Sequence, residues 1–383
     1  MRSETVGLIG YGSSVYEKTA TRSEQGYMAL AARAALDSAG LSPRDIDGIS
    51  VSSTTLPPDN AVTLAEHFGL SPRWTSMGNA GGAGSVINVM DAVQAVESGR
   101  ASCVLCLAGA AQDTEFFKDR INRFNRSVAD YLAPHGFGGM NGLFGIIMRK
   151  HMETYGTRRE SLGRISVDQR ANAGQNDNAL LRKPMTLEEY LNAPLIADPI
   201  RLFDCVLPCA GAEALIVAPL DRAQPGKGVR VVAAAERHNH PVGEVSPLRG
   251  GWETFREGFY DEAGFGPEDV QFIQAYDDYP IMVAVQIEDL GFCPKGEIGG
   301  FLDAHSLRWD GDLPLNTGGG QLSCGQTGGG GGMIGITEAV RQLRGEGGGR
   351  QVPGARRGLV SGYGMVGYGH GLSASAMMLE AVA

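Results

Sequence analysis

The chain has 383 residues, of which 43% are hydrophobic and 20% charged, and its formal net charge is −10. This acidic balance argues against a nucleic-acid partner, which would need a basic face. No apolar stretch reaches the roughly 18 residues of a membrane span, and the N-terminus lacks the apolar region of a signal peptide, so we expect a cytoplasmic protein.

Strand-like and helix-like segments alternate from the start of the chain, as they do in layered α/β folds. A chain of this length also favours two core units over one. In the first half we expect strands at 5–12, 46–54, near Trp74, 101–110 and 211–219, and helices at 23–40, 60–70 and from residue 84. Residues 112–197 are polar and loop-rich, which indicates an insertion across the layered core.

The second half begins with a strand at 229–236 and repeats the alternation. The stretches "GGAGSVINVMDAV" (81–93) and "GGGGGMIGITEAV" (328–340) align without gaps and share six of thirteen residues. Internal similarity of this kind indicates a repeated unit. We therefore predict two pseudo-duplicated halves, residues 1–220 and 226–383, whose glycine-led helices pack against each other at the centre.

The glycine cluster at 81–84 admits two interpretations. Small residues let two helices cross closely, whereas the free backbone amides of Gly81 and Gly82 at a helix N-terminus could polarise a reacting carbonyl. The dinucleotide fingerprint matches only weakly and no Walker A sequence follows, so a phosphate site is not favoured. Both remaining interpretations stay open at the level of the sequence.

Tyr276 and Asp277 follow a predicted strand, at the end where α/β folds usually carry their sites. Both could donate protons or orient a ligand. The next two residues, Asp278 and Tyr279, are interpreted as a helix cap and a packed ring.

Two later segments add candidates. The glycine-rich stretch 315–335 carries Asn316, Gly319, Cys324 and Gln326, and Cys324 could be a nucleophile if the helix end lowers its pKa. The last cluster lies between the final two strands and comprises Ser361, Tyr363, Gly364, Tyr368 and His370, with His370 as a candidate base.

The other cysteines do not predict a metal site. Some of their spacings are metal-like, but they lie in apolar runs without a second matching pair. We interpret them as small buried residues: Cys103, Cys106, Cys205 and Cys209.

Taken together, the duplicated core and four segments resemble the thiolase superfamily, specifically its sterol-carrier-protein-like thiolases and bacterial lipid-transfer-protein aldolases. The segments are "YDDYPIMVAVQIEDLGFCPKGEIGGF", "LPLNTGGGQLSCG", "EAVRQLRGE" and "DPIRLFDCVLPCAGAEALIVAP". The resemblance implies the five-layered αβαβα thiolase fold, a homodimer, and a coenzyme A thioester as substrate without a covalently bound cofactor.

Three positions depart from the family pattern. The resemblance places a nucleophilic cysteine at Gly81, the histidine of a Gly-His-Pro motif at Gln326, and a second cysteine near Ser361. Covalent thiolysis is therefore not expected, because no acyl-cysteine can form where the fold would present one.

Tyr276 stands where the resemblance implies a group that faces the reacting carbonyl, and steroid side-chain aldolases of this family use tyrosine hydroxyls for retro-aldol cleavage. The leading hypothesis is an enzyme that makes or breaks a carbon–carbon bond in an acyl-CoA by aldol-type rather than covalent chemistry, with Tyr276 as acid/base and Asp277 orienting it. The remaining candidates are Gln326 and His370 as catalytic groups, and Gly81, Gly82, Asn316, Gly319 and Gly364 as substrate-binding positions.

The resemblance also implies a small zinc-ribbon/OB-fold acyl-CoA-binding protein as partner. Two alternatives remain open. One is a non-catalytic acyl-CoA-binding or scaffolding subunit, and the other is an acyltransferase that uses Cys324 as a relocated nucleophile.

Overall fold

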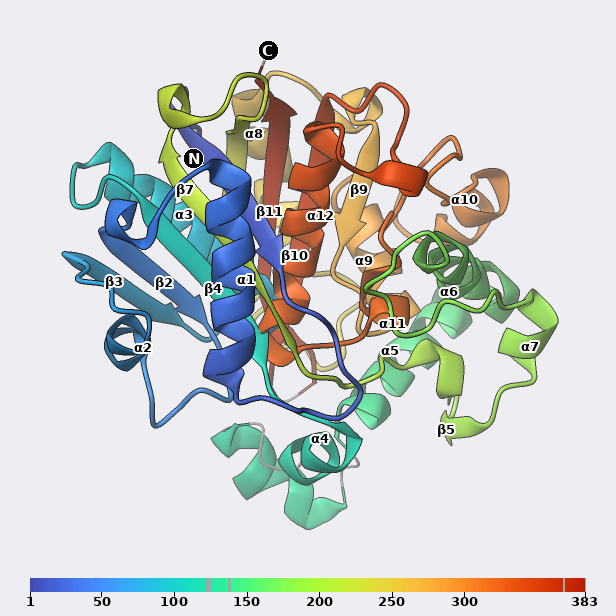
Figure 1. The fold of residues 1–383 in the computed structure, drawn as a ribbon. Coiled ribbons are helices and arrows are strands. Elements are labelled where there is room, and N and C mark those ends of the chain that lie inside the picture. Colours follow the sequence, from blue (N-terminus) through green and yellow to red (C-terminus); the bar gives the residue numbers. More distant parts are fainter. Residues whose placement is uncertain (122–124, 137–138, 368, 383) are drawn as a thin grey trace.

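A computed structural model describes residues 1–121, 125–136, 139–367 and 369–382. Its strands form a mixed sheet, and the two halves of this sheet enclose a central pair of helices. Other helices cover the outer faces of the sheet (Figure 1). The sheet strands, as the structure has them, are β1 (Val6–Ser13), β2 (Gly48–Ser52), β3 (Trp74–Gly78), β4 (Val104–Ala110), β7 (Gly211–Pro219), β8 (Val229–His238), β9 (Phe272–Ala275), β10 (Arg357–Val366) and β11 (Gly371–Ala381).

The strand order shows two matching halves. It runs β3-β2-β4-β7-β1-β8-β11-β10-β9. In the first half β7 lies antiparallel between β1 and β4, and β2 is parallel to β4. In the second half β11 lies antiparallel between β8 and β10, and β9 is parallel to β10. Each strand of the second half therefore has a counterpart in the first.

The halves meet where β1 pairs with β8 over two residue pairs, Gly7 with Arg230 and Leu8 with Val229. A Cβ at Gly7 would lie 2.3 Å from the carbonyl oxygen of Val229, so the two backbones approach too closely for any side chain at this position. Strands β7 and β8 are connected by residues 220–228.

Three apolar clusters define the layers. One outer cluster joins α1 (Glu24–Ala39) and α2 (Ala61–His67) to the first half of the sheet. The central cluster holds α3 (Gly84–Glu97) and α12 (Ile334–Leu343) between the two halves. The other outer cluster joins α8 (Trp252–Ala263) and α9 (Pro280–Asp289) to the second half. This is the predicted five-layered αβαβα arrangement.

The remaining helices and strands belong to loops and to the region expected as an insertion. They are α4 (Thr114–Ile121), α5 (Met140–Tyr155), α6 (Arg159–Ala173), α7 (Leu187–Leu191), β5 (Leu195–Ala197), β6 (Ile200–Arg201), α10 (Ile298–Ala304) and α11 (Gly320–Cys324). Helices α4 to α7 run along the lower and right side of Figure 1. Helix α5 packs its apolar residues into the same cluster as α9, which brings this region next to the end of β9.

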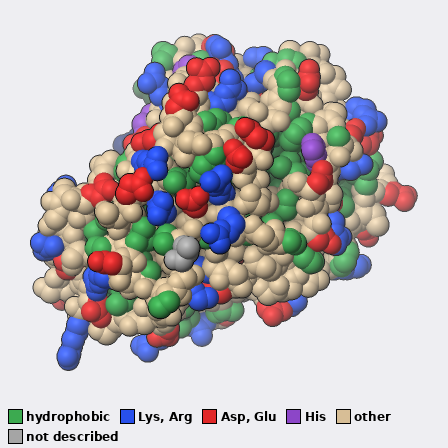
Figure 2. Space-filling model, turned by 90° about the horizontal axis from the view of Figure 1, so that it is seen from above, with side chains coloured by type: hydrophobic (Ala, Val, Ile, Leu, Met, Phe, Trp, Pro, Cys, Tyr) green, Lys and Arg blue, Asp and Glu red, His purple; other side chains and the backbone are tan. Residues whose placement is uncertain are grey.

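Charged side chains of both signs are interspersed over the end of the molecule that carries the C-terminus (Figure 2). None of the helices in the described part of the chain is both long and apolar enough to cross a membrane.

Candidate active site

Tyr276 lies immediately after β9, as the sequence predicted, and its backbone is fixed on both sides. Its amide donates to the carbonyl oxygen of Ser361 at 3.1 Å, and its own carbonyl accepts from Nε2 of Gln286 at 2.7 Å. The side chain is 7% exposed. The ring therefore extends in a defined direction from the end of the strand.

The ring of Tyr276 fills the space beside the glycine cluster. A Cβ built on Gly82 would lie 2.0 Å from Cε2 of Tyr276, which is inside the ring's van der Waals surface. A Cβ at Gly81 would lie 2.5 Å from the amide nitrogen of Met365, and Gly81 has a φ of +57°. Glycine at position 82 thus allows the tyrosine to lie against the helix end, and glycine at position 81 allows the close approach of the β10 backbone.

The Tyr276 hydroxyl has a partner on each side. It donates to Oδ2 of Asp278 at 2.9 Å, and Gln326 forms a hydrogen bond that favours the ionised phenol. Burial and the Asp278 charge still raise the pKa of Tyr276 well above its usual range. The hydroxyl is therefore protonated at neutral pH, and one donor and one acceptor hold it in place.

A second glutamine fixes the orientation of Gln326. Nε2 of Gln112 donates to Oε1 of Gln326 at 2.7 Å and to its backbone oxygen at 2.9 Å, and the amide of Gly328 donates to the same Oε1 at 3.2 Å. Because Oε1 accepts these bonds, Nε2 of Gln326 is the atom left to donate to Tyr276. Gln112 follows β4 and was not identified from the sequence.

These groups open into a cavity of about 60 Å³. Its walls include Gly81, Gly82 and Gly364, together with Tyr276, Asp278 and Gln326. The apolar walls come from the insertion, α9 and β10: Phe117, Met140, Phe144, Met282, Tyr363, Met365 and Val366. Thr54, Gly328 and Gly329 complete the lining. Five of the predicted site residues therefore converge here: Gly81, Gly82, Tyr276, Gln326 and Gly364.

Asp277 does not orient Tyr276, which corrects the role expected for it. Its carboxylate accepts from the backbone amides of Gln321 at 2.9 Å and Leu322 at 3.2 Å, so it caps α11. The residue that orients the tyrosine is Asp278, which was expected to be a helix cap. The N-cap of α9 is instead Tyr279, because Pro280 occupies the first helical position.

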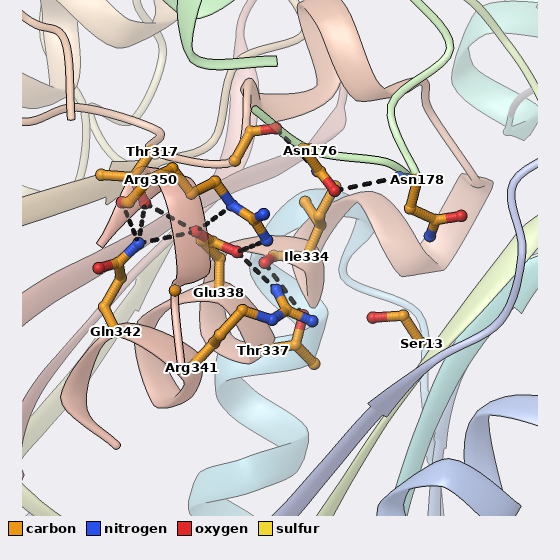
Figure 3. A network of polar contacts seen from close by, with 12 residues as sticks. Ser13, Asn176, Asn178, Thr317, Ile334, Thr337, Glu338, Arg341, Gln342 and Arg350 are labelled. Atoms are coloured by element: carbon orange, nitrogen blue, oxygen red, sulfur yellow. Dashed lines mark hydrogen bonds and ion pairs between the residues drawn. The ribbon is translucent and has the colours of Figure 1, made fainter. Parts of the chain in front are cut away.

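Asn316 and Cys324 lie behind the strand end, in a second cavity of about 440 Å³ that also touches Tyr276 and Asp277. The side chain of Asn316 binds both backbone groups of Ala275, at 2.9 and 3.0 Å, and so fastens the end of β9. Helix α12 forms one wall, where Glu338 lies between the guanidinium groups of Arg341 and Arg350 (Figure 3).

The setting of Cys324 disfavours the relocated-nucleophile hypothesis. Its thiol is 2% exposed and donates to the carbonyl oxygen of Gly318 at 2.9 Å. Burial raises the pKa of this thiol to about 12, whereas a nucleophilic cysteine needs a lowered pKa.

Two other candidates line neither cavity in the described part of the chain. Gly319 has a φ of +105° and packs against Ala173. His370 is 6% exposed, and burial lowers the pKa of its ring. It lies between β10 and β11, and neither of its ring nitrogens has a hydrogen-bond partner among the described residues. Tyr368, from the same segment, lies outside the described residues.

The glycine run at 328–332 is explained by close approach of backbones. A Cβ at Gly329 would lie 2.3 Å from the carbonyl oxygen of Ser52, and one at Gly332 would lie 2.6 Å from that of Gly82. Oγ of Ser85 also donates to the carbonyl oxygen of Gly329 at 3.3 Å. The two glycine-led segments therefore cross at the centre, as the packing interpretation predicted.

Comparison with known proteins gives the family. A model of the thiolase C-terminal domain-like family matches residues 251–377. The 17-hydroxy-3-oxo-4-pregnene-20-carboxyl-CoA lyase of Mycobacterium tuberculosis is 31% identical over 365 residues, which cover 90% of this chain and 93% of the lyase. The chain belongs to the thiolase superfamily.

Two further proteins show how broad this superfamily's chemistry is. The acetyl-CoA acetyltransferase of Methanothermobacter thermautotrophicus is 30% identical over 373 residues, covering 94% of this chain and 97% of the enzyme. The solved structure of Ltp2-ChsH2(DUF35) aldolase superposes with a TM-score of 0.86 at 29% identity, covering 98% of both chains. These similarities confirm the expected group, which includes lipid-transfer-protein aldolases.

In this thiolase-superfamily chain two of the three replaced positions lie together, whereas the third, Ser361, lines the larger cavity. Gly81, at the position assigned to the nucleophilic cysteine, and Gln326, at the position assigned to the histidine, both line the small cavity. The Tyr276 ring occupies the volume beside them. A tyrosine hydroxyl held between a carboxylate and an amide thus lies in the same cavity as the position at which the resemblance places the nucleophilic cysteine.

Proposed function

We propose that this chain is an acyl-CoA carbon–carbon lyase that cleaves a β-hydroxyacyl-CoA by a retro-aldol reaction, without a covalent intermediate. The observation that carries the proposal is the Tyr276 hydroxyl, which faces the small cavity with Asp278 as acceptor and Gln326 as donor. The similar proteins named as a CoA lyase and an aldolase support the same class of reaction.

Each part of the site has a role in this reaction. Tyr276 takes the proton of the substrate's β-hydroxyl and passes its own proton to Asp278 as the carbon–carbon bond breaks, and the bonding electrons move toward the thioester carbonyl. The amides of Gly81 and Gly82 donate to no described protein acceptor, so they can stabilise the enolate oxygen. Cleavage releases a ketone or aldehyde, and return of the proton taken from the β-hydroxyl to the enolate carbon gives the shortened acyl-CoA, so all atoms are accounted for.

The proposal includes a cytoplasmic homodimer that binds its substrate as a coenzyme A thioester. It also includes a zinc-ribbon/OB-fold partner that delivers the acyl-CoA. The name of the solved aldolase, Ltp2-ChsH2(DUF35), contains a second component, which is why a partner is part of the proposal.

The test measures turnover of a panel of β-hydroxyacyl-CoA thioesters, with and without the partner protein. The acyl groups of the panel range from short chains with a tertiary β-hydroxyl to steroid-sized groups. Released acyl-CoA and carbonyl product are measured by mass spectrometry. We expect Tyr276→Phe to lower kcat by about 10²- to 10⁴-fold, the usual contribution of a positioned acid/base. Full turnover by Tyr276→Phe would exclude the proposed chemistry and favour a non-catalytic subunit.

Tyr279→Phe is the matched control. Tyr279 is a buried tyrosine three residues away whose hydroxyl donates to Oδ1 of Asn141 at 2.6 Å and whose ring stacks on Phe144. It does not line the small cavity. Its removal should leave turnover within a few-fold of the unmodified protein.

A further inference from the structure

Asp278 is a carboxylate in an unusual setting. Oδ2 accepts the Tyr276 hydroxyl at 2.9 Å, whereas Oδ1 is shielded from solvent and has no hydrogen-bond partner in the described part of the chain. The residue lines the small cavity, and no salt bridge with it is found among the described residues. A shielded carboxylate without a cation costs stability, so its presence points to a role other than holding the fold together.

We propose that Asp278 stores the proton that Tyr276 takes from the substrate and returns it, through the same hydroxyl, to the acyl-CoA enolate. This inference rests on the retro-aldol function proposed above. It assigns to Asp278 a positioning and proton-accepting role that acts through Tyr276.

The hydrogen-bonding capacity of a phenol fits this relay. The Tyr276 oxygen has one proton and two lone pairs; the proton goes to Asp278, and one lone pair accepts from Gln326. One lone pair remains for the substrate hydroxyl on the cavity side. When that hydroxyl gives up its proton to Tyr276, the proton of Tyr276 passes to Asp278, and no charge is left on the phenol.

The second half of the reaction reverses the transfer. Cleavage leaves an enolate whose α-carbon needs a proton, and protonated Asp278 is the store that supplies it through Tyr276. After this step Asp278 is again a carboxylate and Tyr276 again a phenol. The proton removed from the β-hydroxyl has become the new α-hydrogen of the shortened acyl-CoA, so no external acid or base is consumed.

The titratable groups around Asp278 leave it free to act near neutral pH. Tyr276 and Asp277 lie beside Asp278 at the same strand end. Tyr279 lies near it at the start of α9, and Cys205 lies near it in the loop before β7. Burial raises the pKa of both tyrosines well above 10 and that of Cys205 to about 12, so these three stay protonated. Burial raises the pKa of Asp278 to about 7 and that of Asp277 to about 8.

The test is exchange of the α-hydrogens of acetyl-CoA in D₂O, followed by mass spectrometry. Because the last step of cleavage adds a proton to the α-carbon, its reverse removes one. Deuterium enters when the proton held by Tyr276 and Asp278 exchanges with solvent before it is returned. The cavity of about 60 Å³ suits an acyl group this small. We expect exchange with the unmodified protein and with Tyr279→Phe, none with Tyr276→Phe, and at least 100-fold slower exchange with Asp278→Asn.

The pH profile separates a proton-accepting role from a structural one. Since Asp278 must be ionised to accept, exchange by the unmodified protein should fall as pH drops below about 7. The residual exchange of Asp278→Asn should lack this acid limb. Asparagine keeps the shape and an acceptor oxygen, so thermal unfolding should show a folded variant.

The possible outcomes separate the two proposals. If Tyr276→Phe is inactive while Asp278→Asn exchanges within threefold of the unmodified protein with its acid limb intact, the Asp278 inference is wrong and the lyase proposal stands. If the unmodified protein does not exchange, or Tyr276→Phe exchanges normally, the proposed function itself is wrong.

Discussion

At the residue scale, Gly82 and Tyr276 share one volume. The Cβ that any other residue would place at position 82 falls 2.0 to 2.4 Å from three ring atoms of Tyr276. The tyrosine is held by its backbone and by two partners of its hydroxyl, so it cannot move aside without losing one of them. The glycine is therefore part of the mechanism, because it decides where the hydroxyl lies.

We expect Gly82→Ala to lower lyase turnover by about 100-fold although every chemical group of the site is retained. A displacement of about 1 Å is enough for a loss of this size. The rate is measured with the best substrate of the panel, and folding is checked by thermal unfolding. Gly258→Ala is the control, since Gly258 is an exposed helical glycine with open space at its Cβ position. Normal turnover by Gly82→Ala would show that the ring can relocate freely.

Part of this site was accessible from the sequence. Tyr276 could be found because it follows a strand, and Gly81, Gly82 and Gln326 could be found as departures from a family pattern. Asp278 was misassigned as a cap, although the proline at 280 marks residue 279 as the N-cap. Gln112 gave no local signal, because its partner is 214 positions away and only the fold brings them together.

At the element scale, α12 is fixed by a buried ionic network. Glu338 accepts from Arg350 at 2.9 and 3.0 Å and from Nη1 of Arg341 at 2.5 Å, as Figure 3 shows. Burial opposes the charge of Glu338, but the two arginines outweigh it and lower its pKa to about 2. Thr317 and Gln342 add hydrogen bonds to the same carboxylate. The network thus joins α12 to the segments on either side of it.

We expect Glu338→Gln to lower the free energy of unfolding by about 3 to 5 kcal/mol, because it leaves a buried guanidinium without its anion. The measurement is denaturant-induced unfolding at pH 7. Glu115→Gln, which breaks the exposed pair of Glu115 with Lys118, is the control and should change the value by less than about 1 kcal/mol. A loss below 1 kcal/mol at Glu338 would mean that Arg350 and Arg341 find other acceptors.

At the scale of the whole molecule, the duplicated halves form one continuous sheet and share a central layer. The alternation of strands and helices predicted the elements, and the glycine-led repeat predicted the crossing at the centre. The junction of β1 with β8 was not predictable, because it covers only two residue pairs and leaves no periodic pattern. The site lies at the crossing, so residues from both halves reach one cavity: Gly81 and Gly82 from the first, Tyr276 and Gln326 from the second.

A site of this kind should make the stability of the whole molecule depend on pH. The pKa of Asp278 is raised from 3.8 to about 7 by burial, so the folded state holds its proton more tightly than the unfolded state does. Stability therefore falls as pH rises from about 4 to 7, as the unfolded state ionises first. Asp278→Asn cannot ionise and should escape this loss.

We therefore expect Asp278→Asn to unfold with nearly the free energy of the unmodified protein at pH 4 and to be more stable at pH 8. The difference should be on the order of 2 to 4 kcal/mol, since each unit of pKa shift corresponds to about 1.4 kcal/mol. Urea denaturation at several pH values measures it. Asp47→Asn should show the opposite sign, because amide donors from Ser102 and Cys103 outweigh burial and lower the pKa of Asp47. If Asp278→Asn is instead less stable than the unmodified protein at pH 8, the Asp278 carboxylate stabilises the fold. The proposed cost of keeping this carboxylate for proton storage is then wrong.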